Sequence, residues 1–196
     1  MYVRIEGDSL SDSAKGISVA CTTDEVFVRV VGRGTFQNSQ PLRRFAMEMI
    51  EKGYRRFTVD VGACPNMDST FLGVLAGIGL RLRQDGKPAA EVSVVSVSPR
   101  NLDLLQTLGL DRLFTVQTLE TNGTPVSWPA GAAVERLPDS DIESLSKPLD
   151  KNETTDLMLD AHNSLVRADE RNAPRFSGVT KFLRESVERG RSDKSK

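Results

Sequence analysis

A strand-like run, a short polar motif and an apolar helical run follow one another between residues 57 and 82, and this order limits the fold more than any other feature. Phe57, Val59 and Val61 alternate with polar residues, which is the pattern of a half-buried strand. The apolar residues that follow recur at helical spacing, and they are Phe71, Val74, Leu75, Ile78 and Leu82. The chain must therefore pass from a strand into a helix between Asn66 and Gly73.

The same alternation of strands and helices is repeated on both sides of this junction. Two apolar runs, 17–21 and 26–31, are separated by a polar break of hairpin length and predict an opening antiparallel pair. A one-sided helical pattern over residues 42–50 stops at Gly53. The later expected elements are a strand at 92–97, a helix from Pro99 to Gly109 and a strand at 113–116. Together they predict an α/β fold in which helices cover a mixed sheet mainly on one face.

The junction places Asp68, Ser69 and Thr70 on the first turn of the expected helix. Backbone N–H groups in that turn have no partner within the helix, and the helix dipole leaves partial positive charge there, so a phosphate attached to a serine is stabilised. A second interpretation is simple capping, because Asp and Ser side chains commonly accept hydrogen bonds from these N–H groups. The three residues alone leave both interpretations open.

The wider motif, Met67-Asp68-Ser69-Thr70-Phe71-Leu72-Gly73 between a strand and an apolar helix, resembles the signature of the anti-sigma factor antagonist family. The domain of that family is called STAS, and the resemblance covers Ile17 to Gln117. It implies a regulatory protein in which Ser69 is phosphorylated by a partner kinase that is itself an anti-sigma factor. Thr70 is the alternative acceptor on the same resemblance.

Two positions depart from the family signature. Phe71 stands where the family usually has glycine, so a kinase that approaches the backbone there would meet an aromatic ring. The second strand ends in Gly32-Arg33-Gly34-Thr35-Phe36, which lacks the acidic residue that lies near the acceptor in relatives. Both departures concern phosphorylation more than the fold.

Gly73 and Gly77 share a face of the expected helix that differs from its apolar stripe. Glycine inside a helix costs about 0.5–1 kcal/mol relative to alanine, so the repeat indicates close packing. The close neighbour is either the protein's own sheet or another protein, and the resemblance implies that this helix faces the partner. The expected partner contacts are Asp68, Ser69, Thr70, Phe71, Gly73 and Gly77.

The composition changes after the last expected strand. We expect an N-terminal segment (1–16), a STAS-like domain (17–118), a linker (119–138), a helical extension (139–190) and a disordered tail (191–196). Helical patterns in the extension fall near 139–146, 153–171 and 178–189. The latter two carry narrow apolar stripes, Leu157, Ala161, Leu165 and Ala168, then Phe176, Val179, Phe182, Leu183 and Val187. Because such helices are not stable alone, they either dock within the chain, pair with each other or bind a second protein.

The overall charge and the cysteine content exclude several classes of protein. A net charge of −1 and a pI near 5.9 give no general attraction to nucleic acid or to an anionic membrane. The sequence begins without a signal peptide and has no apolar run near the roughly 20 residues that cross a bilayer, so we expect a cytoplasmic protein. Cys21 and Cys64 are too few and too far apart for a metal or redox site, and no motif indicates a cofactor.

Three functions follow from these features. A serine hydrolase is the weakest, because Ser69 has no Gly-x-Ser-x-Gly context and the only histidine, His162, is expected on the surface of the extension. The favoured function is a non-enzymatic switch, in which the protein binds an anti-sigma factor with serine/threonine kinase activity until phosphate beside Asp68 repels that partner. The main alternative is a scaffold that is not phosphorylated, in which Phe71 makes a constitutive contact and the C-terminal helices bind the partner.

Overall fold

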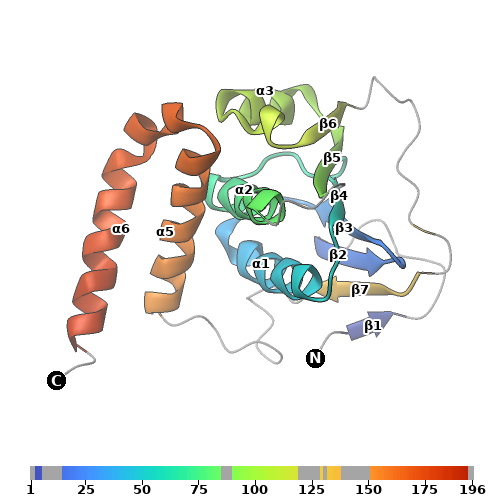
Figure 1. Cartoon of the computed structure of the whole chain (residues 1–196), viewed down its shortest axis with the longest axis horizontal. Coiled ribbons are helices and arrows are strands. Elements are labelled where there is room, and N and C mark those ends of the chain that lie inside the picture. The colour runs from blue at the N-terminus through green and yellow to red at the C-terminus, as the bar shows by residue number, and fades with distance from the viewer. Residues whose placement is uncertain are drawn as a thin grey trace.

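A sheet of seven strands forms the framework of the protein (Figure 1). The computed structural model describes residues 3–5, 15–84, 90–118, 129, 132–137 and 151–193. The strands are β1 (Val3–Ile5), β2 (Gly16–Cys21), β3 (Glu25–Val31), β4 (Arg56–Asp60), β5 (Glu91–Val97), β6 (Thr115–Thr118) and β7 (Val134–Leu137). Their order across the sheet is β1-β7-β2-β3-β4-β5-β6.

The sheet is mixed, as the sequence predicts. β2 and β3 form the expected antiparallel hairpin, whereas β3, β4, β5 and β6 run parallel to one another. Val28, Val59 and Val94 lie next to one another across β3, β4 and β5, and each is at most 2% exposed. Because parallel strands end at the same edge of a sheet, the loops that follow β3 and β4 lie at that edge.

Helices cover one face of the sheet in successive layers. They are α1 (Phe36–Glu51), α2 (Ser69–Gln84), α3 (Pro99–Thr107), α5 (Lys151–Ala168) and α6 (Ala173–Asp193), with short 3-10 helices η1 (Leu110–Arg112) and η2 (Glu170–Asn172). Figure 1 shows α1 and α2 next to the sheet, α5 outside α2, and α6 farthest from the sheet. The predicted α/β fold, covered mainly on one face, is therefore confirmed.

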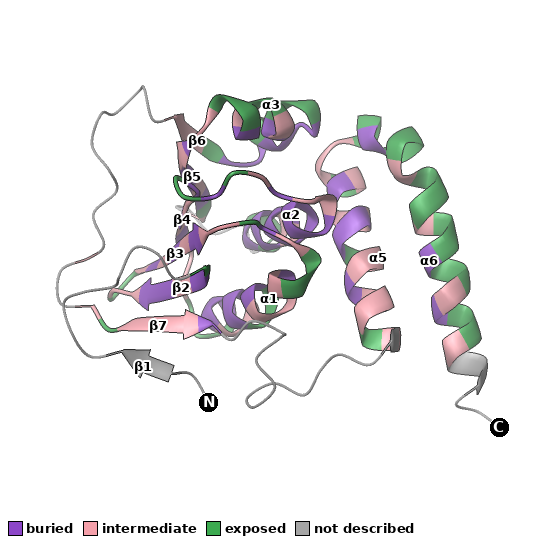
Figure 2. Ribbon diagram, turned by 180° about the vertical axis from the view of Figure 1, so that it is seen from behind, coloured by how far each residue is buried: buried purple, intermediate pink, exposed green. Residues whose placement is uncertain are grey.

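α2 is the helix around which these layers are built. Leu75, Ile78 and Leu82, from its predicted apolar stripe, are at most 3% exposed and belong to the main core. Its other side also bears buried residues, because α5 packs there, and Figure 2 shows α2 coloured as buried along most of its length. A helix enclosed from two sides explains why glycine is tolerated inside it.

β7 lies inside the stretch that the sequence predicts as a linker. It pairs antiparallel with β2, where Ser18 is opposite Arg136, and with β1, where Arg4 is opposite Glu135. Its four residues, Val-Glu-Arg-Leu, do not alternate between apolar and polar, so the sequence carries no strand signal there. β7 and β6 are consecutive strands of the chain, yet they lie near opposite edges of the sheet.

The C-terminal extension folds back as a hairpin of α5 and α6. Most of the first predicted stripe is buried, since Leu157, Ala161 and Leu165 are at most 3% exposed and Ala168 is partly buried. The second stripe is divided: Leu183 and Val187 are buried, whereas Val179 and Phe182 are 37% and 62% exposed. The helix expected at 139–146 lies outside the described residues. α6 continues to Asp193, so residues 191–193 are helical where the sequence predicts a disordered tail.

Candidate functional site

The loops after β3 and β4 are joined by backbone hydrogen bonds at the carboxyl edge of the parallel strands. The N–H of Gly32 donates to the carbonyl of Ala63 (2.9 Å), and the N–H of Gly34 donates to the carbonyl of Asn66 (3.1 Å). The N–H of Asp68 donates back to the carbonyl of Gly34 (2.9 Å). Each loop leads directly into a helix, so these bonds hold the first turns of α1 and α2 beside each other.

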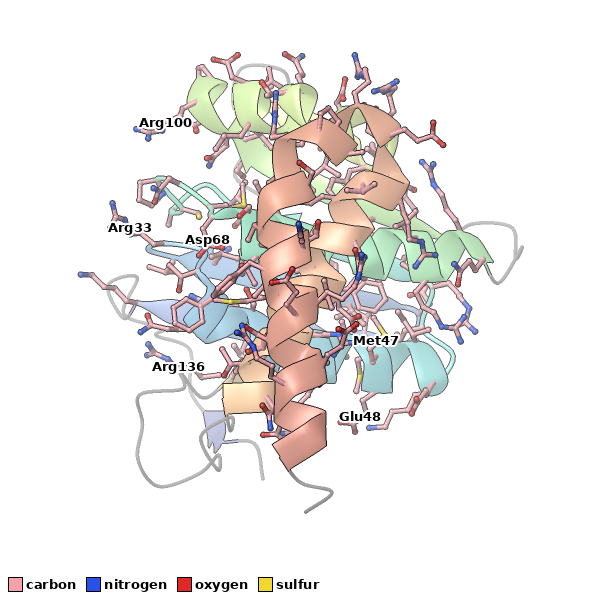
Figure 3. All side chains as sticks on the ribbon, turned by 90° about the vertical axis from the view of Figure 1, so that its left-hand side faces the viewer. Arg33, Met47, Glu48, Asp68, Arg100 and Arg136 are labelled. Atoms are coloured by element: carbon pink, nitrogen blue, oxygen red, sulfur yellow. The ribbon has the colours of Figure 1, made fainter. Side chains whose placement is uncertain are left out.

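The Asp68 carboxylate caps both helices at once. Its Oδ1 accepts a hydrogen bond from the N–H of Phe71 in α2 (2.8 Å), and its Oδ2 accepts one from the N–H of Phe36 in α1 (2.9 Å). Both N–H groups belong to first turns, where no carbonyl within the helix is available. The capping interpretation of the junction is therefore correct for Asp68. In Figure 3 the Asp68 side chain is seen at the border of the α5–α6 hairpin.

Ser69, the first residue of α2, makes its side-chain contact with the C-terminal extension. Its Oγ lies 3.1 Å from Nε2 of His162, and Nδ1 of His162 lies 2.7 Å from the carbonyl oxygen of Met158. A carbonyl can only accept, so Nδ1 carries the proton of the neutral ring and leaves Nε2 as an acceptor. The Ser69 hydroxyl therefore donates to Nε2 of His162.

The sequence-based placement of His162 on the surface is wrong. The residue is 6% exposed, and its ring makes a T-shaped contact with the ring of Phe176, with 5.1 Å between ring centroids. Burial follows from the return of α5 onto α2, which brings residues 93 positions apart into hydrogen-bond contact. The only signal in the sequence is that His162 adjoins the apolar stripe through Ala161 and Leu165.

Gly73 and Gly77 form the surface on which α5 rests. A Cβ atom added to Gly73 would lie 2.8 Å from Cα of Ala161 and closer still to its carbonyl, a distance that real Cβ atoms do not reach. A Cβ atom added to Gly77 would lie 3.2 Å from Oγ of Ser164. The close neighbour of this glycine face is thus α5 of the same chain, rather than the sheet or a second protein.

Phe71 and Thr70 point away from solvent. Phe71 is fully buried, and a Cβ atom added to Gly34 would lie 2.7 Å from the Phe71 ring, so the ring fills the space that the glycine leaves. Phe71 therefore belongs to the core rather than to a surface that a kinase or scaffold partner can touch. Thr70 is 5% exposed, whereas Ser69 is half-buried. Of the two predicted acceptors, Ser69 is therefore the less buried residue.

Neither cysteine has the surroundings of a reactive thiol. Burial raises the pKa of the Cys64 thiol and, with a smaller contribution from Glu135, that of the half-buried Cys21 thiol. A thiol that stays protonated is a poor nucleophile and metal ligand. Within the described residues, no group of three or more His, Cys, Asp or Glu side chains is arranged to hold a metal ion. In the same part of the chain, no helix has the length and apolar character needed to cross a membrane.

Comparison with known proteins identifies the family. The model of the family described as "Mlab, STAS domain" matches residues 17–118, which is more than half of the chain. A search of curated proteins gives no significant match. The chain belongs to the STAS domain family, as its sequence predicts.

Solved structures that match this chain include an anti-sigma factor antagonist and a putative one. One is a putative anti-sigma factor antagonist, TM1081 from Thermotoga maritima, with 19% identity, a TM-score of 0.46, and coverage of 50% of this chain and 83% of that one. The other is the anti-sigma factor antagonist SpoIIAA in its unphosphorylated form, with 15% identity, a TM-score of 0.42, and coverage of 46% and 82% respectively.

Proposed function

We propose that this STAS protein is a regulator of the anti-sigma factor antagonist type, which binds an anti-sigma factor with serine kinase activity and is switched by phosphorylation of Ser69. The observation that carries the proposal is the position of Ser69. It is the first residue of a 16-residue helix, it directly follows a carboxylate, and as a residue it is less buried than Thr70. Residues at this position can carry a phosphate because the helix dipole stabilises it.

Phosphorylation would change the charge of this surface sharply. A phosphoserine carries about −1.5 to −2 charges at neutral pH, and it would stand beside the carboxylate of Asp68. A partner that binds the neutral Ser69 would have to remove water from this anion and face two adjacent negative groups. A coupling of about 1–3 kcal/mol changes affinity roughly five- to 150-fold, which is enough for a regulatory switch.

The test is phosphate transfer from ATP by a candidate anti-sigma kinase. Wild-type protein should incorporate one phosphate, Ser69→Ala should incorporate none, and Thr70→Val should still be phosphorylated. Ser69→Asp should bind the kinase at least about fivefold more weakly than wild type. If Ser69→Ala is labelled as strongly as wild type and releases its partner in the same way, the switch at this residue is wrong.

A constitutive scaffold is the second candidate, and the exposed apolar residues of α6 favour it. Val179 and Phe182 lie on the solvent side of the hairpin, with 37% and 62% of their surface exposed. A partner bound there would be insensitive to Ser69→Asp and would lose affinity with Phe182→Ala. The opposite result, loss with Ser69→Asp alone, supports the switch.

The contact between Ser69 and His162 also calls for a test of hydrolase chemistry. A serine–histidine pair is the core of many hydrolases, but there the imidazole is oriented by a carboxylate and the serine faces a substrate cleft. Here Nδ1 of His162 is bound by a backbone carbonyl, and the ring is buried between helices. A groove of about 550 Å³ between α1, α2 and α5 is lined by neither residue. We therefore expect no labelling of Ser69 by a fluorophosphonate probe.

A further inference from the structure

The C-terminal hairpin occupies the face of α2 on which Ser69 is presented. In Figure 3 the hairpin lies in front of the helices that cover the sheet. His162 of α5 takes the Ser69 hydroxyl as a hydrogen-bond donor, and Ala161 sits directly against Gly73 one turn further along α2. The acceptor and the glycine face are thus covered by one element of the same chain.

We propose that the α5–α6 hairpin is an intramolecular competitor for the partner, so that Ser69 becomes available only when the hairpin leaves α2. The proposal rests on the function proposed above, because it assigns a regulator to the same serine. A kinase must place the acceptor oxygen in line with the terminal phosphate of ATP, and it needs the surrounding backbone to be accessible. With α5 in place, the Ser69 oxygen is hydrogen-bonded to His162 and lies beneath that helix.

The hairpin is attached through two different kinds of contact. The first is apolar, because Leu157, Ala161 and Leu165 pack against α2 and the main core. A partner that displaces α5 must cover this surface of α2 in its place, so it has to offer an apolar helix with small residues opposite Gly73 and Gly77.

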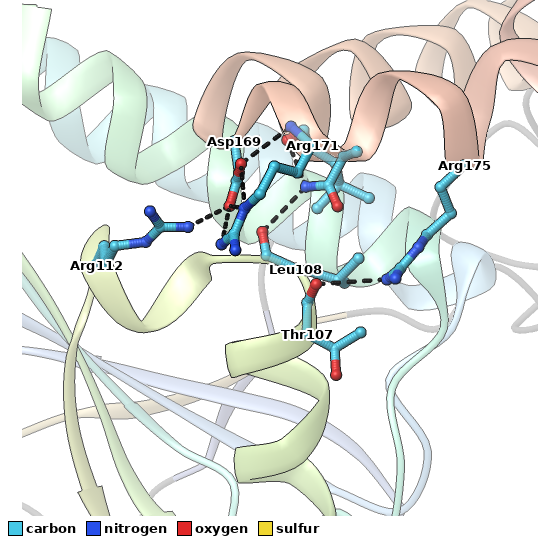
Figure 4. A network of polar contacts seen from close by, with 8 residues as sticks. Thr107, Leu108, Arg112, Asp169, Arg171 and Arg175 are labelled. Atoms are coloured by element: carbon cyan, nitrogen blue, oxygen red, sulfur yellow. Dashed lines mark hydrogen bonds and ion pairs between the residues drawn. The ribbon is translucent and has the colours of Figure 1, made fainter.

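The second contact is polar and lies at the turn between the two helices (Figure 4). Asp169 is paired with Arg112 and with Arg171, so that one carboxylate joins the hairpin to η1. The side-chain amide of Asn172 donates to the carbonyls of Leu108 (3.0 Å) and Leu165 (2.9 Å). We call these contacts of Asp169 and Asn172 the latch. The latch lies at the turn, and Ser69 is covered by the adjoining helix α5.

The seam along α5 is not completely filled. A groove of about 550 Å³ remains where α1, α2 and α5 meet, and Gly73, Gly77 and Ala161 are among its lining residues. Arg43 and Asp160 also line it, and they form an ion pair whose side chains are 45% and 61% exposed. Exposed ion pairs contribute little to stability, so this side of the interface opposes displacement weakly.

A methyl group added at Gly73 would act as a wedge between α2 and α5, and it tests whether the hairpin controls access to Ser69. Gly73→Ala places a Cβ atom where Ala161 now lies, whereas Gly178→Ala on α6 is the matched control because no atom lies within 4 Å of the added Cβ. His162 is the only histidine, so its reaction with diethyl pyrocarbonate measures opening directly. We expect Gly73→Ala to react at least about tenfold faster than wild type and Gly178→Ala to react at the wild-type rate. Equal rates for all three, with helical circular dichroism retained, overturn the proposal.

A disulfide provides the converse test in the full chain and does not depend on tolerance of the wedge. A Cβ atom on Gly77 would lie 3.8 Å from Cβ of Ser164, which is the usual separation across a disulfide. Gly77→Cys with Ser164→Cys, in a Cys21→Ser background, should lock α5 onto α2 when oxidised. We expect the oxidised form to react with diethyl pyrocarbonate, and to be phosphorylated by an anti-sigma kinase with ATP, at least about tenfold more slowly than the reduced form.

The two proposals fail in different ways. If oxidised and reduced forms are phosphorylated at the same rate, and Ser69→Ala abolishes both signals, Ser69 is the acceptor and the hairpin does not control it. If neither form is phosphorylated while the wedge and the lock still change the reactivity of His162, the hairpin opens as inferred and the proposed role of Ser69 is wrong.

Discussion

Replacing Asp68 should reveal how much stability one carboxylate provides by capping two helices. Asp68→Ala removes the acceptor for the N–H groups of Phe71 and Phe36, which lie 2.8 and 2.9 Å away. Loss of a single N-cap side chain costs about 0.5–2 kcal/mol, typically about 1 kcal/mol. With two caps lost, we expect the free energy of unfolding to fall by about 2 kcal/mol. Asp68→Asn keeps an oxygen for Phe71 but turns an amide nitrogen towards Phe36, so it should lose about 1 kcal/mol.

Urea unfolding followed by far-UV circular dichroism measures these differences. Asp103→Ala is the matched control, because Asp103 is an exposed carboxylate within α3 that caps neither α1 nor α2. The expected order of stability is wild type and Asp103→Ala together, then Asp68→Asn, then Asp68→Ala. The double cap is refuted if the free energy of unfolding of Asp68→Ala lies within about 0.5 kcal/mol of wild type. It is also refuted if Asp68→Asn is as unstable as Asp68→Ala.

Three further predictions concern the core and the latch. Phe71→Ala should lower the free energy of unfolding by about 3–5 kcal/mol in urea titrations, because the fully buried ring leaves a cavity; a loss below about 1 kcal/mol contradicts its core role. Asn172→Ala should cost about 1–3 kcal/mol and speed amide hydrogen exchange in α5, since two carbonyls lose their donor; unchanged exchange argues against the latch. Arg171 lowers the pKa of the Asp169 carboxyl from 3.8 to about 2, so this pair stabilises the fold above about pH 4 and is lost as the pH falls towards 2. The difference in urea midpoint between wild type and Asp169→Asn should therefore shrink from pH 5 to pH 2.5, and a constant difference would contradict it.

The framework of the fold could be predicted because its elements carry strong periodic signals. The alternation of Phe57, Val59 and Val61 and the stripe that begins at Phe71 define β4 and α2 without any partner residue being known. β7 could not be predicted, because its residues carry no periodic signal of their own. Four residues within a turn-rich stretch form a strand only because β2 offers an unpaired edge, and that edge is a property of the assembled sheet.

The site was predicted only in part, because its defining contacts join distant parts of the chain. The capping role of Asp68 is local, and the sequence indicates it. The bond from Ser69 to His162 spans 93 positions, and no spacing rule connects them. The sequence suggests that the Phe71 ring would obstruct a partner. Its packing against Gly34 could not be predicted, because that contact depends on two loops meeting at one edge of the sheet. The glycine repeat did signal a close neighbour, and the structure identifies it as α5.

The late position of β7 in the chain has a consequence for biosynthesis and for the design of shorter fragments. During translation, β2 has neighbours on one side only until residues 134–137 have left the ribosome, so its other side exposes backbone donors and acceptors. A recombinant fragment that ends at residue 118, where the family match ends, keeps that edge open permanently. Open edges recruit strands from other molecules, and such a fragment should therefore aggregate more readily than the 196-residue chain.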